Sequence, residues 1–511
     1  MSKAPFGFVP LIVIYVLAHA AIQLWTPNLG RDQTIDALFA QQWSWGASYR
    51  NPPLYTWALT ALNELFGAHK AAQLILKFGA LLAMYLCLFA AAKRLFESRR
   101  MAAVAGASPL AMEIFAWDAI RHYTHSIFLS AVIAATFLVV LRLCESRRPI
   151  DFLAFAVLIA LGVLTKYGYL IFAVTLLLAM ALQPRYRQVL INPWMIASLV
   201  LALLLVLPHA LHLYQHSWVQ IQAEGAHSLQ ISPARNLPND TLAGLSSLAE
   251  NTLQFTLPLP ALLVLCFPAV LWRWRTQADE ATLLLRTQLL AAALVLIAGI
   301  FVLGMTEISR HYLIGVFFLF PLWACKEIDR AYAKGGMRGG LNAVVCGLGF
   351  FVALAFAYSI LEVFYAPHPP IGKACKRCYA HRPYDEIAAQ IRDQVGGDFG
   401  TILSYDHLTG GNLLLRFPEA RVLTAKYPQL KPPRSTQRGC LVIGKPGTLI
   451  DVPLNHSSFG QWVRKYIPVE RLGDLDSDVT VGKLRAPLYF SDTRFFELEY
   501  ASVADGIGEC R

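Results

Sequence analysis

The chain has 511 residues, of which 56% are hydrophobic and only 15% are charged. Soluble domains carry about 25% charged residues, so this deficit and a mean hydropathy of +0.47 exclude an ordinary soluble protein. The formal net charge is +11. Lys and Arg gather in short clusters beside apolar segments, however, which is typical of membrane topology and not of a nucleic-acid partner.

Apolar runs recur along residues 1–365 and predict an all-α polytopic membrane protein with about eleven transmembrane helices. In chain order, these helices are expected near residues 6–25, 70–95, 101–118, 125–143, 150–165, 168–183, 190–214, 250–272, 284–304, 310–327 and 341–364. The first run follows only Lys3 and lacks a small-residue cleavage site, so we expect a retained helix and not a signal peptide. With the N-terminus inside, every basic cluster lies on the cytoplasmic side, as the positive-inside rule requires.

The same topology predicts two domains, a transmembrane catalytic domain over 1–365 and a soluble periplasmic domain over 366–511. Residues 26–69 form the first extracytoplasmic loop of the transmembrane domain. In the C-terminal part, "PYDEIAAQIRDQV" has helical spacing, "GTILSY" and "CLVIGK" are typical of strands, and "GGNLLLRFP" of a short helix or turn. This alternation predicts a small α/β domain outside the membrane.

Cysteines fall into two groups. Five lie in or beside apolar spans, where cysteine is usually an inert packing residue. The other four, Cys375, Cys378, Cys440 and Cys510, lie in the polar C-terminal part. Up to two disulfides are expected there if that part is extracytoplasmic. A zinc site is the alternative, but a single C-x-x-C lacks a second nearby ligand pair.

The first loop carries the most specific motif of the chain, "DQTIDALFAQQWSWGASYRNPPLYTWALTALNELFG" over residues 32–67. It resembles the first extracytoplasmic loop of the GT-C glycosyltransferases of the protein-mannosyltransferase and aminoarabinose-transferase superfamily. The matching positions, in order and spacing, are Asp32, Trp45-Gly46, Pro52-Pro53-Leu54, Trp57 and Leu65-Phe66-Gly67. Weaker similarities follow in "LGVLTKYGYL" and "SRHYLIGVFFLFPL" and in the layout of the whole chain.

The resemblance implies an integral enzyme of the bacterial inner membrane, active on its periplasmic side. Such an enzyme takes a sugar from a polyprenyl-phosphate donor held beside it in the lipid bilayer, and passes it, with inversion, to an envelope glycolipid such as lipid A or lipopolysaccharide core. A protein acceptor is the alternative. No cofactor is expected. The relatives of the aminoarabinose branch have an acid and a Lys before Pro-Pro, whereas this chain has Arg50 and Asn51, so we predict no metal.

Asp32 is the candidate catalytic base. It lies next to the membrane, where partial desolvation raises the pKa of a carboxyl group toward useful values. The competing interpretation is a helix N-cap, because Asp32 precedes "QTIDALFAQQW", where an Asp would satisfy free backbone N–H groups. Asp36, one turn further on, is the other candidate for the base.

Three cations are candidates for binding the donor phosphate. Arg50 offers a two-pronged guanidinium in place of the missing Lys, and Lys166 and Arg310 lie at predicted outer ends of helices. Lys166 lies in an apolar context, where a charge is expensive and is therefore a functional hypothesis by default. The alternatives are a headgroup-facing Arg and a Lys that snorkels to the interface.

Histidines are candidates for acceptor binding or proton handling. His122 and His125 lie in "RHYTHSIF", at a point where relatives often carry an acid, and His311 follows Arg310. Structural roles at helix ends are the alternative for each of them.

Two further functional classes compete with a transferase. A transporter or flippase of lipid-linked sugars fits the polytopic layout, but it needs no base in the first loop and favours polar residues through the middle of several helices. A catalytically inactive scaffold fits the loss of the acid and Lys before Pro-Pro. Retention of Asp32 favours the enzyme.

Overall fold

The structure is a computed structural model, and it describes residues 7–46, 51–216, 237–272, 278–332, 336–365, 379–450, 452–472, 478–505, 507 and 510. The chain forms two compact units. The first comprises Met1–His19, Ser48–Tyr55 and Lys77–Phe356, and the second comprises Ala20–Ala47, Thr56–Leu76 and Ala357–Arg511. The second unit therefore joins much of the predicted first loop to the C-terminal part of the chain.

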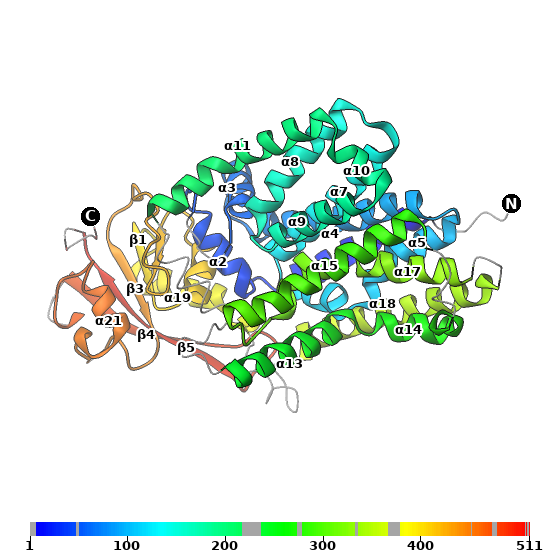
Figure 1. The fold of residues 1–511 in the computed structure, drawn as a ribbon. Coiled ribbons are helices and arrows are strands. Elements are labelled where there is room, and N and C mark those ends of the chain that lie inside the picture. Colours follow the sequence, from blue (N-terminus) through cyan, green and yellow to red (C-terminus); the bar gives the residue numbers. More distant parts are fainter. Residues whose placement is uncertain are drawn as a thin grey trace. The chain divides into compact units, whose positions relative to one another are not determined.

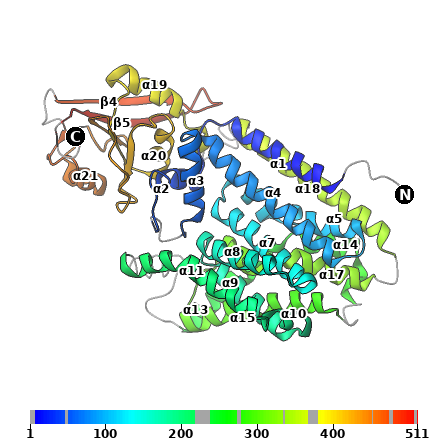
Figure 2. The same cartoon turned by 90° about the horizontal axis from the view of Figure 1, so that it is seen from above.

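Helices make up the regular secondary structure of the first unit in its described residues, apart from one isolated β-bridge between Met112 and Pro258 (Figures 1 and 2). Its longer helices, some of which continue into the second unit, are α1 (Phe8–Leu24), α4 (Lys70–Leu95), α7 (His125–Ser146), α8 (Pro149–Thr165), α9 (Tyr169–Leu182), α11 (Pro193–His216), α13 (Leu237–Thr256), α15 (Glu280–Leu303), α17 (Phe320–Ala331) and α18 (Met337–Tyr365). Shorter ones are α5 (Arg99–Ala107), α6 (Ala119–Arg121), α10 (Pro184–Leu190), α14 (Leu259–Cys266) and α16 (Ile314–Phe317).

Within the described residues, five helices are long and apolar enough to cross a membrane, namely α4, α7, α11, α15 and α18. The number rises to seven if two bent pairs, α9 with α10 and residues 310–317 with α17, are each one span. Helices α1 and α8 are apolar but shorter. The membrane-protein prediction is thus supported, but the count of eleven is not confirmed.

Besides the bent segment of residues 310–331, two further expected helices are interrupted. The segment near 101–118 is α5 followed by a 3-10 turn, Ser108–Ala111, and a π-helical turn, Ile114–Asp118. The segment near 250–272 is α13, α14 and a 3-10 turn, Pro268–Leu271, with Pro258 between the two helices. Proline lacks the N–H that a continuous helix requires, and hydropathy does not register that loss.

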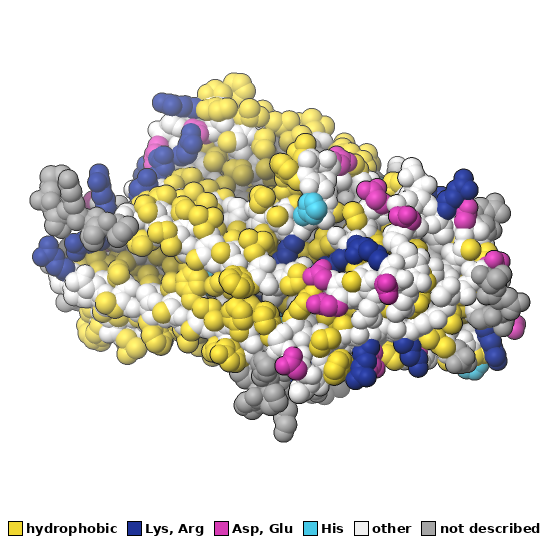
Figure 3. Space-filling view, turned by 180° about the vertical axis from the view of Figure 1, so that it is seen from behind, with side chains coloured by type: hydrophobic (Ala, Val, Ile, Leu, Met, Phe, Trp, Pro, Cys, Tyr) yellow, Lys and Arg dark blue, Asp and Glu magenta, His cyan; other side chains and the backbone are white. Residues whose placement is uncertain are grey.

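Apolar side chains cover broad areas of the molecular surface, as the yellow atoms in Figure 3 show. Leu203 on α11 is 65% exposed and Leu294 on α15 is 64% exposed. Surface of this kind is rare on soluble monomers and is the normal outer face of helices in lipid.

The second unit contains a five-stranded sheet in the order β2-β1-β3-β5-β4. Its strands are β1 (Thr401–Ser404), β2 (Arg421–Thr424), β3 (Cys440–Gly444), β4 (Val479–Pro487) and β5 (Phe495–Val503). Strand β1 pairs in parallel with β2 and β3, whereas β5 is antiparallel to β3 and β4. The predicted α/β domain is confirmed, with "GTILSY" and "CLVIGK" supplying β1 and β3.

Helices cover both faces of this sheet. One apolar core joins the sheet to α19 (Tyr384–Val395), α20 (His407–Leu414) and α2 (Arg31–Phe39). The opposite core joins it to α21 (Ser458–Val463) and the segment after it. Helix α2 belongs to the predicted first loop, and its Ala37, Leu38 and Phe39 are 3%, 0% and 2% exposed. The loop therefore contributes a structural layer to the C-terminal sheet.

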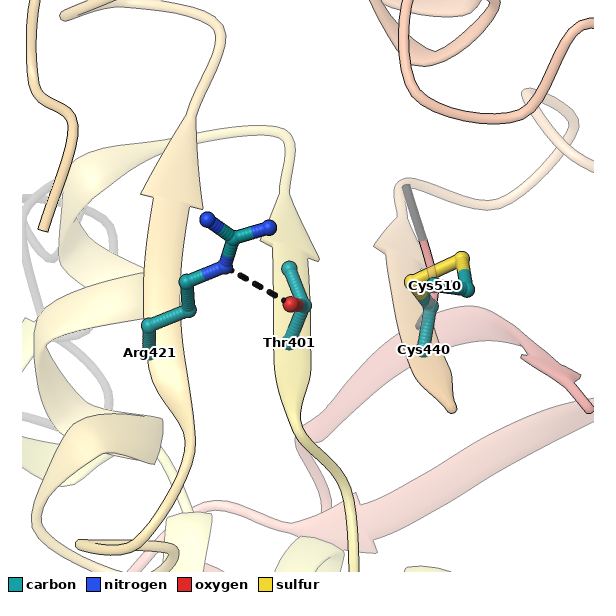
Figure 4. The surroundings of a disulfide bond; sticks show 4 residues. All are labelled: Thr401, Arg421, Cys440 and Cys510. Atoms are coloured by element: carbon teal, nitrogen blue, oxygen red, sulfur yellow. Dashed lines mark hydrogen bonds between the residues drawn. A yellow bond between two sulfur atoms is a disulfide. The ribbon is translucent and has the colours of Figure 1, made fainter. Parts of the chain in front are cut away.

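A disulfide joins Cys440 on β3 to Cys510 near the end of the chain (Figure 4). On the same sheet, the Arg421 Nε donates a hydrogen bond to the Thr401 hydroxyl at 2.9 Å. One of the expected disulfides is thus present. Cys375 and Cys378 lie outside the described residues.

Candidate active site

Asp32 lies in the first turn of α2 and is half-buried. The N-cap of this helix is Gly30, whose backbone N–H donates to the Gln33 side-chain oxygen at 2.9 Å. The interpretation of Asp32 as the cap is therefore wrong, because Gly30 occupies the N-cap position and Asp32 lies inside the first turn of the helix. A carboxylate in the first turn still gains from the helix dipole.

Asp36 differs from Asp32 in its environment. It is only 3% exposed, and its backbone carbonyl accepts from the N–H of Ala40 at the end of α2. A base that works on a large acceptor must be reachable, so the half-buried Asp32 fits that role better than the enclosed Asp36.

Residues of α20 hold the N-terminal half of α2. The Asn412 side chain accepts a hydrogen bond from the Leu29 N–H at 2.8 Å and donates one to the Leu29 carbonyl at 3.4 Å. At Gly411 a Cβ atom would lie 2.6 Å from the Thr34 carbonyl oxygen, closer than real contacts allow. The two helices can approach this closely only because position 411 has no side chain.

The C-terminal end of α2 is held by the edge of the sheet. The Gln41 side chain accepts from the Val422 N–H at 2.7 Å and donates to the Val422 carbonyl at 3.0 Å. Strand β2 is the last strand on that side, so the amide of Gln41 pairs with its outer edge as another strand would. Helix α2, with Asp32, is thereby fixed at both ends.

The Trp-Gly motif of the first loop folds onto α3 (Leu54–Phe66). The Trp57 indole N–H donates to the Ser44 carbonyl at 2.8 Å, and the ring of Trp45 packs edge-on against it at 4.9 Å. Trp43 donates to the Glu64 carboxylate at 2.6 Å. These aromatic residues therefore shape the loop.

Lys166 lies in the first unit, at the C-cap of α8. Its side chain is not an exposed interfacial one, because the residue is only 9% exposed. The ammonium donates to the Ser126 hydroxyl at 2.7 Å and lies 5.7 Å from the centre of the Tyr312 ring. A buried ammonium in an apolar part of a membrane protein is a functional hypothesis by default.

A second glycine brings the Lys166 and Arg310 segments together. A Cβ atom at Gly315 of α16 would lie 2.6 Å from the carbonyl oxygen of Gly168. This close approach places the turn Arg310–Tyr312 against the end of α8. Two of the predicted phosphate-binding residues therefore lie in one region of the first unit.

Arg310 forms ion pairs with two carboxylates that the sequence analysis did not single out. Its guanidinium lies 3.0 Å from Glu113 and 3.4 Å from Asp118. Both acids precede "RHYTHSIF", where relatives carry an acid at the start of the next helix. Both acids lie close to an apolar run, and this position could have identified them in the sequence as candidate functional residues.

The three candidate histidines have different surroundings in this unit. His125 begins α7, is 6% exposed, and its ring lies 4.9 Å from that of Tyr55. His122 is exposed. The His311 ring lies 4.1 Å from Tyr312 and 6.0 Å from Tyr123. His122 and His311 are thus the two of the three with exposed or half-buried rings.

Lys77 is a further cation that the sequence analysis missed. It is 1% exposed on α4, and its ammonium donates to the backbone carbonyl of Ile120. Ile120 lies between Asp118 and His122, so the buried lysine supports the backbone of this polar segment. The sequence pattern that could have identified it is a lysine inside an otherwise apolar helix, which is a functional hypothesis by default.

Comparisons with known proteins agree with this architecture. Residues 50–212 match the family described as dolichyl-phosphate-mannose-protein mannosyltransferase. The chain is 24% identical over 450 residues to the lipopolysaccharide core galacturonosyltransferase RgtB of Rhizobium johnstonii, covering 85% of this chain and 86% of RgtB. It is 21% identical over 438 residues to the lipopolysaccharide core galacturonosyltransferase RgtA of that organism, with 82% of each chain covered.

The fold is similar to that of ArnT from Cupriavidus metallidurans. The structure of ArnT bound to undecaprenyl phosphate matches with a TM-score of 0.62 at 14% identity, over 98% of both chains. Its apo structure matches with a TM-score of 0.57 at 13% identity, over 96% of this chain and 98% of ArnT. The comparisons support a membrane glycosyltransferase with the GT-C fold. The resemblance of the first loop is thereby confirmed, and the chain is a multi-pass membrane protein.

This GT-C glycosyltransferase presents two kinds of groups that sugar transfer needs. Its second unit holds a half-buried carboxylate on the fixed helix α2, and its first unit gathers cations from three segments, namely Lys77, Lys166 and Arg310. Arg50 lies outside the described residues. Within the part of the chain that the structure describes, no group of three or more His, Cys, Asp or Glu side chains is arranged as a metal site.

Proposed function

We propose that this glycosyltransferase moves galacturonic acid from a polyprenyl-phosphate donor to the lipopolysaccharide core. The observation that carries the proposal is the pair of relatives, RgtB and RgtA. Both are described as lipopolysaccharide core galacturonosyltransferases, and both align over more than four fifths of either chain. Similarity of that extent covers the helical part and the C-terminal sheet alike.

The donor assignment has separate support. ArnT, whose fold is similar, binds undecaprenyl phosphate, and a lipid-linked donor needs no nucleotide-binding fold. We assign Lys166 and Arg310, together with Arg50, to the phosphate of the donor, because ammonium and guanidinium groups attract such an anion and bind it through charge-assisted hydrogen bonds. Glu113 and Asp118 hold the Arg310 guanidinium in place through their ion pairs.

In the proposed step, the Asp32 carboxylate takes the proton of an acceptor hydroxyl. The oxygen of that hydroxyl bonds to the anomeric carbon as the bond from this carbon to the phosphate oxygen breaks. Polyprenyl phosphate leaves with the electron pair, and the cations stabilise its charge. One displacement of this kind inverts the configuration. We write the step without a metal, since Arg50 and Asn51 replace the acid and Lys of the aminoarabinose branch.

The proposed location is the bacterial inner membrane, with the active site and the sheet on the periplasmic side. The Cys440–Cys510 disulfide supports this orientation, because such bonds persist in the periplasm and are rare in the cytosol. The basic clusters support the same orientation, because the positive-inside rule places them on the cytoplasmic side of the membrane.

Mass spectrometry of envelope lipids tests the proposal. We would compare a strain lacking the gene with the same strain complemented by the intact gene. The expected result is that one uronic acid disappears from the lipopolysaccharide core on deletion and returns on complementation. An unchanged core would contradict the proposed acceptor.

An assay with purified protein distinguishes a lipopolysaccharide transferase from a protein O-glycosyltransferase and from a flippase. Mixed in detergent with a polyprenyl-phosphate galacturonate and isolated lipopolysaccharide, the protein should transfer label to the lipopolysaccharide. Label in a protein fraction would favour a protein O-glycosyltransferase. Movement of donor across vesicles without any transfer would favour a flippase.

A further inference from the structure

The three parallel strands of the second unit end together. Ser404 of β1 is paired with Thr424 of β2 on one side and with Ile443 of β3 on the other. The chain leaves β1 for β2 and then returns across β1 to β3. In open α/β sheets, the carboxyl ends of strands at such a reversal form the usual ligand site.

Charged and aromatic side chains follow these strand ends. Lys445 follows β3, and its ammonium lies 5.3 Å from the centre of the Tyr405 ring, which follows β1. Lys426 follows β2, with its ammonium 5.7 Å from the centre of the adjacent Tyr427 ring. Both lysines are exposed, and both tyrosines are half-buried. Cations beside half-exposed aromatic faces suit an anionic sugar.

Arg382 reaches the same edge through a chain of hydrogen bonds. Its guanidinium donates to the Tyr384 hydroxyl at 3.1 Å, and the hydroxyls of Tyr384 and Thr409 lie 3.2 Å apart. The Thr409 hydroxyl then donates to the Tyr405 hydroxyl at 3.4 Å. These bonds fix the position of Tyr405 relative to Arg382.

Positive charge converges on this edge. His407 follows β1, is 6% exposed, and has neither ring nitrogen hydrogen-bonded within the described structure. Burial, followed by the positive charge of Lys426, lowers the pKa of His407 to about 4, with Arg31 and Arg382 acting in the same direction. The Asp406 carboxylate opposes them. Its Oδ1 already accepts from the Thr409 N–H at 2.7 Å.

We propose that Arg31, Arg382, Lys426 and Lys445, here called the carboxyl-edge cluster, bind phosphate or carboxylate groups of the acceptor glycolipid. Tyr405 and Tyr427 then provide faces for its sugar rings. This inference rests on the proposed function, since lipopolysaccharide is a polyanionic acceptor. It gives the C-terminal sheet a role in substrate recognition.

The cluster is suited to the acceptor because of what lies beside it. Arg31 immediately precedes Asp32 on α2, so an anion bound at this edge brings its glycolipid to the helix that carries the candidate base. Helix α2 packs directly on α20, which begins at His407. Binding and positioning of the acceptor would therefore occur within one compact unit.

Direct binding tests the proposal independently of catalysis. The full-length protein in nanodiscs of zwitterionic lipid would be titrated with two probes, lipid A carrying its phosphates and lipid-free core oligosaccharide carrying carboxylates. We expect Lys426→Gln combined with Lys445→Gln to weaken binding of at least one probe about tenfold. The probe that loses affinity identifies the bound group. Arginine at both positions should restore most of the affinity.

The matched control is Lys483→Gln. Lys483 is an exposed lysine on β4, at the opposite end of the strand order, and its loss should leave binding unchanged. Equal affinity of the double variant and the parent for both probes would overturn the proposal. An equal loss in the control would do the same, because it would indicate only non-specific attraction.

Steady-state kinetics then test the role of the cluster separately from the proposed function. With lipopolysaccharide as acceptor, the double variant should raise KM for the acceptor about tenfold and leave KM for the donor within twofold. If the parent protein transfers nothing to lipopolysaccharide, the proposed function is wrong. The binding titration still tests whether the carboxyl-edge cluster binds phosphate or carboxylate groups. A fall in kcat without a change in either KM would contradict a binding role.

Discussion

At the scale of single residues, the choice of base lies between Asp32 and Asp36, one turn apart on α2. Asp32 is half-buried, whereas Asp36 is 3% exposed. We predict that Asp32→Asn lowers kcat by about 10² to 10⁴, the usual contribution of a general base, with little change in KM for the donor. Transfer of labelled sugar by purified protein measures this.

Asp36→Asn is the matched control for that prediction, because it makes the same chemical change one turn away. It should retain most of the activity, although its buried site makes some loss of stability expected. If Asp36→Asn is inactive and Asp32→Asn is active, at equal protein abundance and thermal stability, then Asp36 is the base and Asp32 is not.

Residue environments were the least predictable feature from sequence. Lys77 stands out within its apolar helix, but no local pattern indicates that it contacts Ile120, or that Arg310 pairs with Glu113 and Asp118, almost 200 residues earlier in the chain. Lys166 was expected at the outer end of a helix, with an interfacial position as the alternative, and it is buried there against Ser126. Such pairings depend on how helices distant in sequence pack, and one sequence carries no information about that packing.

At the scale of elements, α2 depends on its contact with α20. A Cβ atom at Gly411 would meet both the carbonyl oxygen and the Cβ of Thr34 at 2.6 Å. We predict that Gly411→Ala pushes the helices apart and lowers kcat about tenfold or more, because displacement of a catalytic group by about 1 Å can cost 10²-fold. The overpacking should also cost about 1–3 kcal/mol of stability.

Kinetics and thermal unfolding of the purified variant test this prediction. The control is Gly79→Ala on α4, where an added Cβ meets no atom within 4 Å, and it should behave as the parent protein does. Unchanged kcat in Gly411→Ala would show that the contact with α20 does not position Asp32. Loss of kcat at unchanged KM for the donor is the signature of displacement rather than of lost binding.

Elements were predictable where the signal was local. Long apolar runs placed α4, α7, α15 and α18 within a few residues of their observed bounds. The interrupted helices were not predictable from hydropathy, which sums apolar character and ignores backbone breaks such as the one at Pro258. Strands β4 and β5 were missed because their burial alternates weakly along β4 and hardly at all along β5.

At the scale of the whole molecule, the chain joins segments that are far apart in sequence. Gln41 pairs with Val422 and Leu29 with Asn412, so the first loop and the C-terminal sheet fold as one unit. The sequence indicated a helical membrane part and an α/β part, but not that helix α2 is a layer of the sheet. The residue argued to be the base is thus held by a part of the chain almost 400 residues away.

The Cys440–Cys510 disulfide links the end of the chain to the middle of this sheet, across a separation of 70 residues. Closing a loop of that length removes unfolded-state entropy worth about 4 kcal/mol. We therefore predict that Cys440→Ser combined with Cys510→Ser lowers the Tm of the second unit, whereas Cys346→Ser, which removes an exposed free thiol, does not. In intact cells, a maleimide reagent should label Cys440 and Cys510 only after reduction. Labelling without reductant would mean that the bond does not form in the cell, and would remove the support that it gives to a periplasmic sheet.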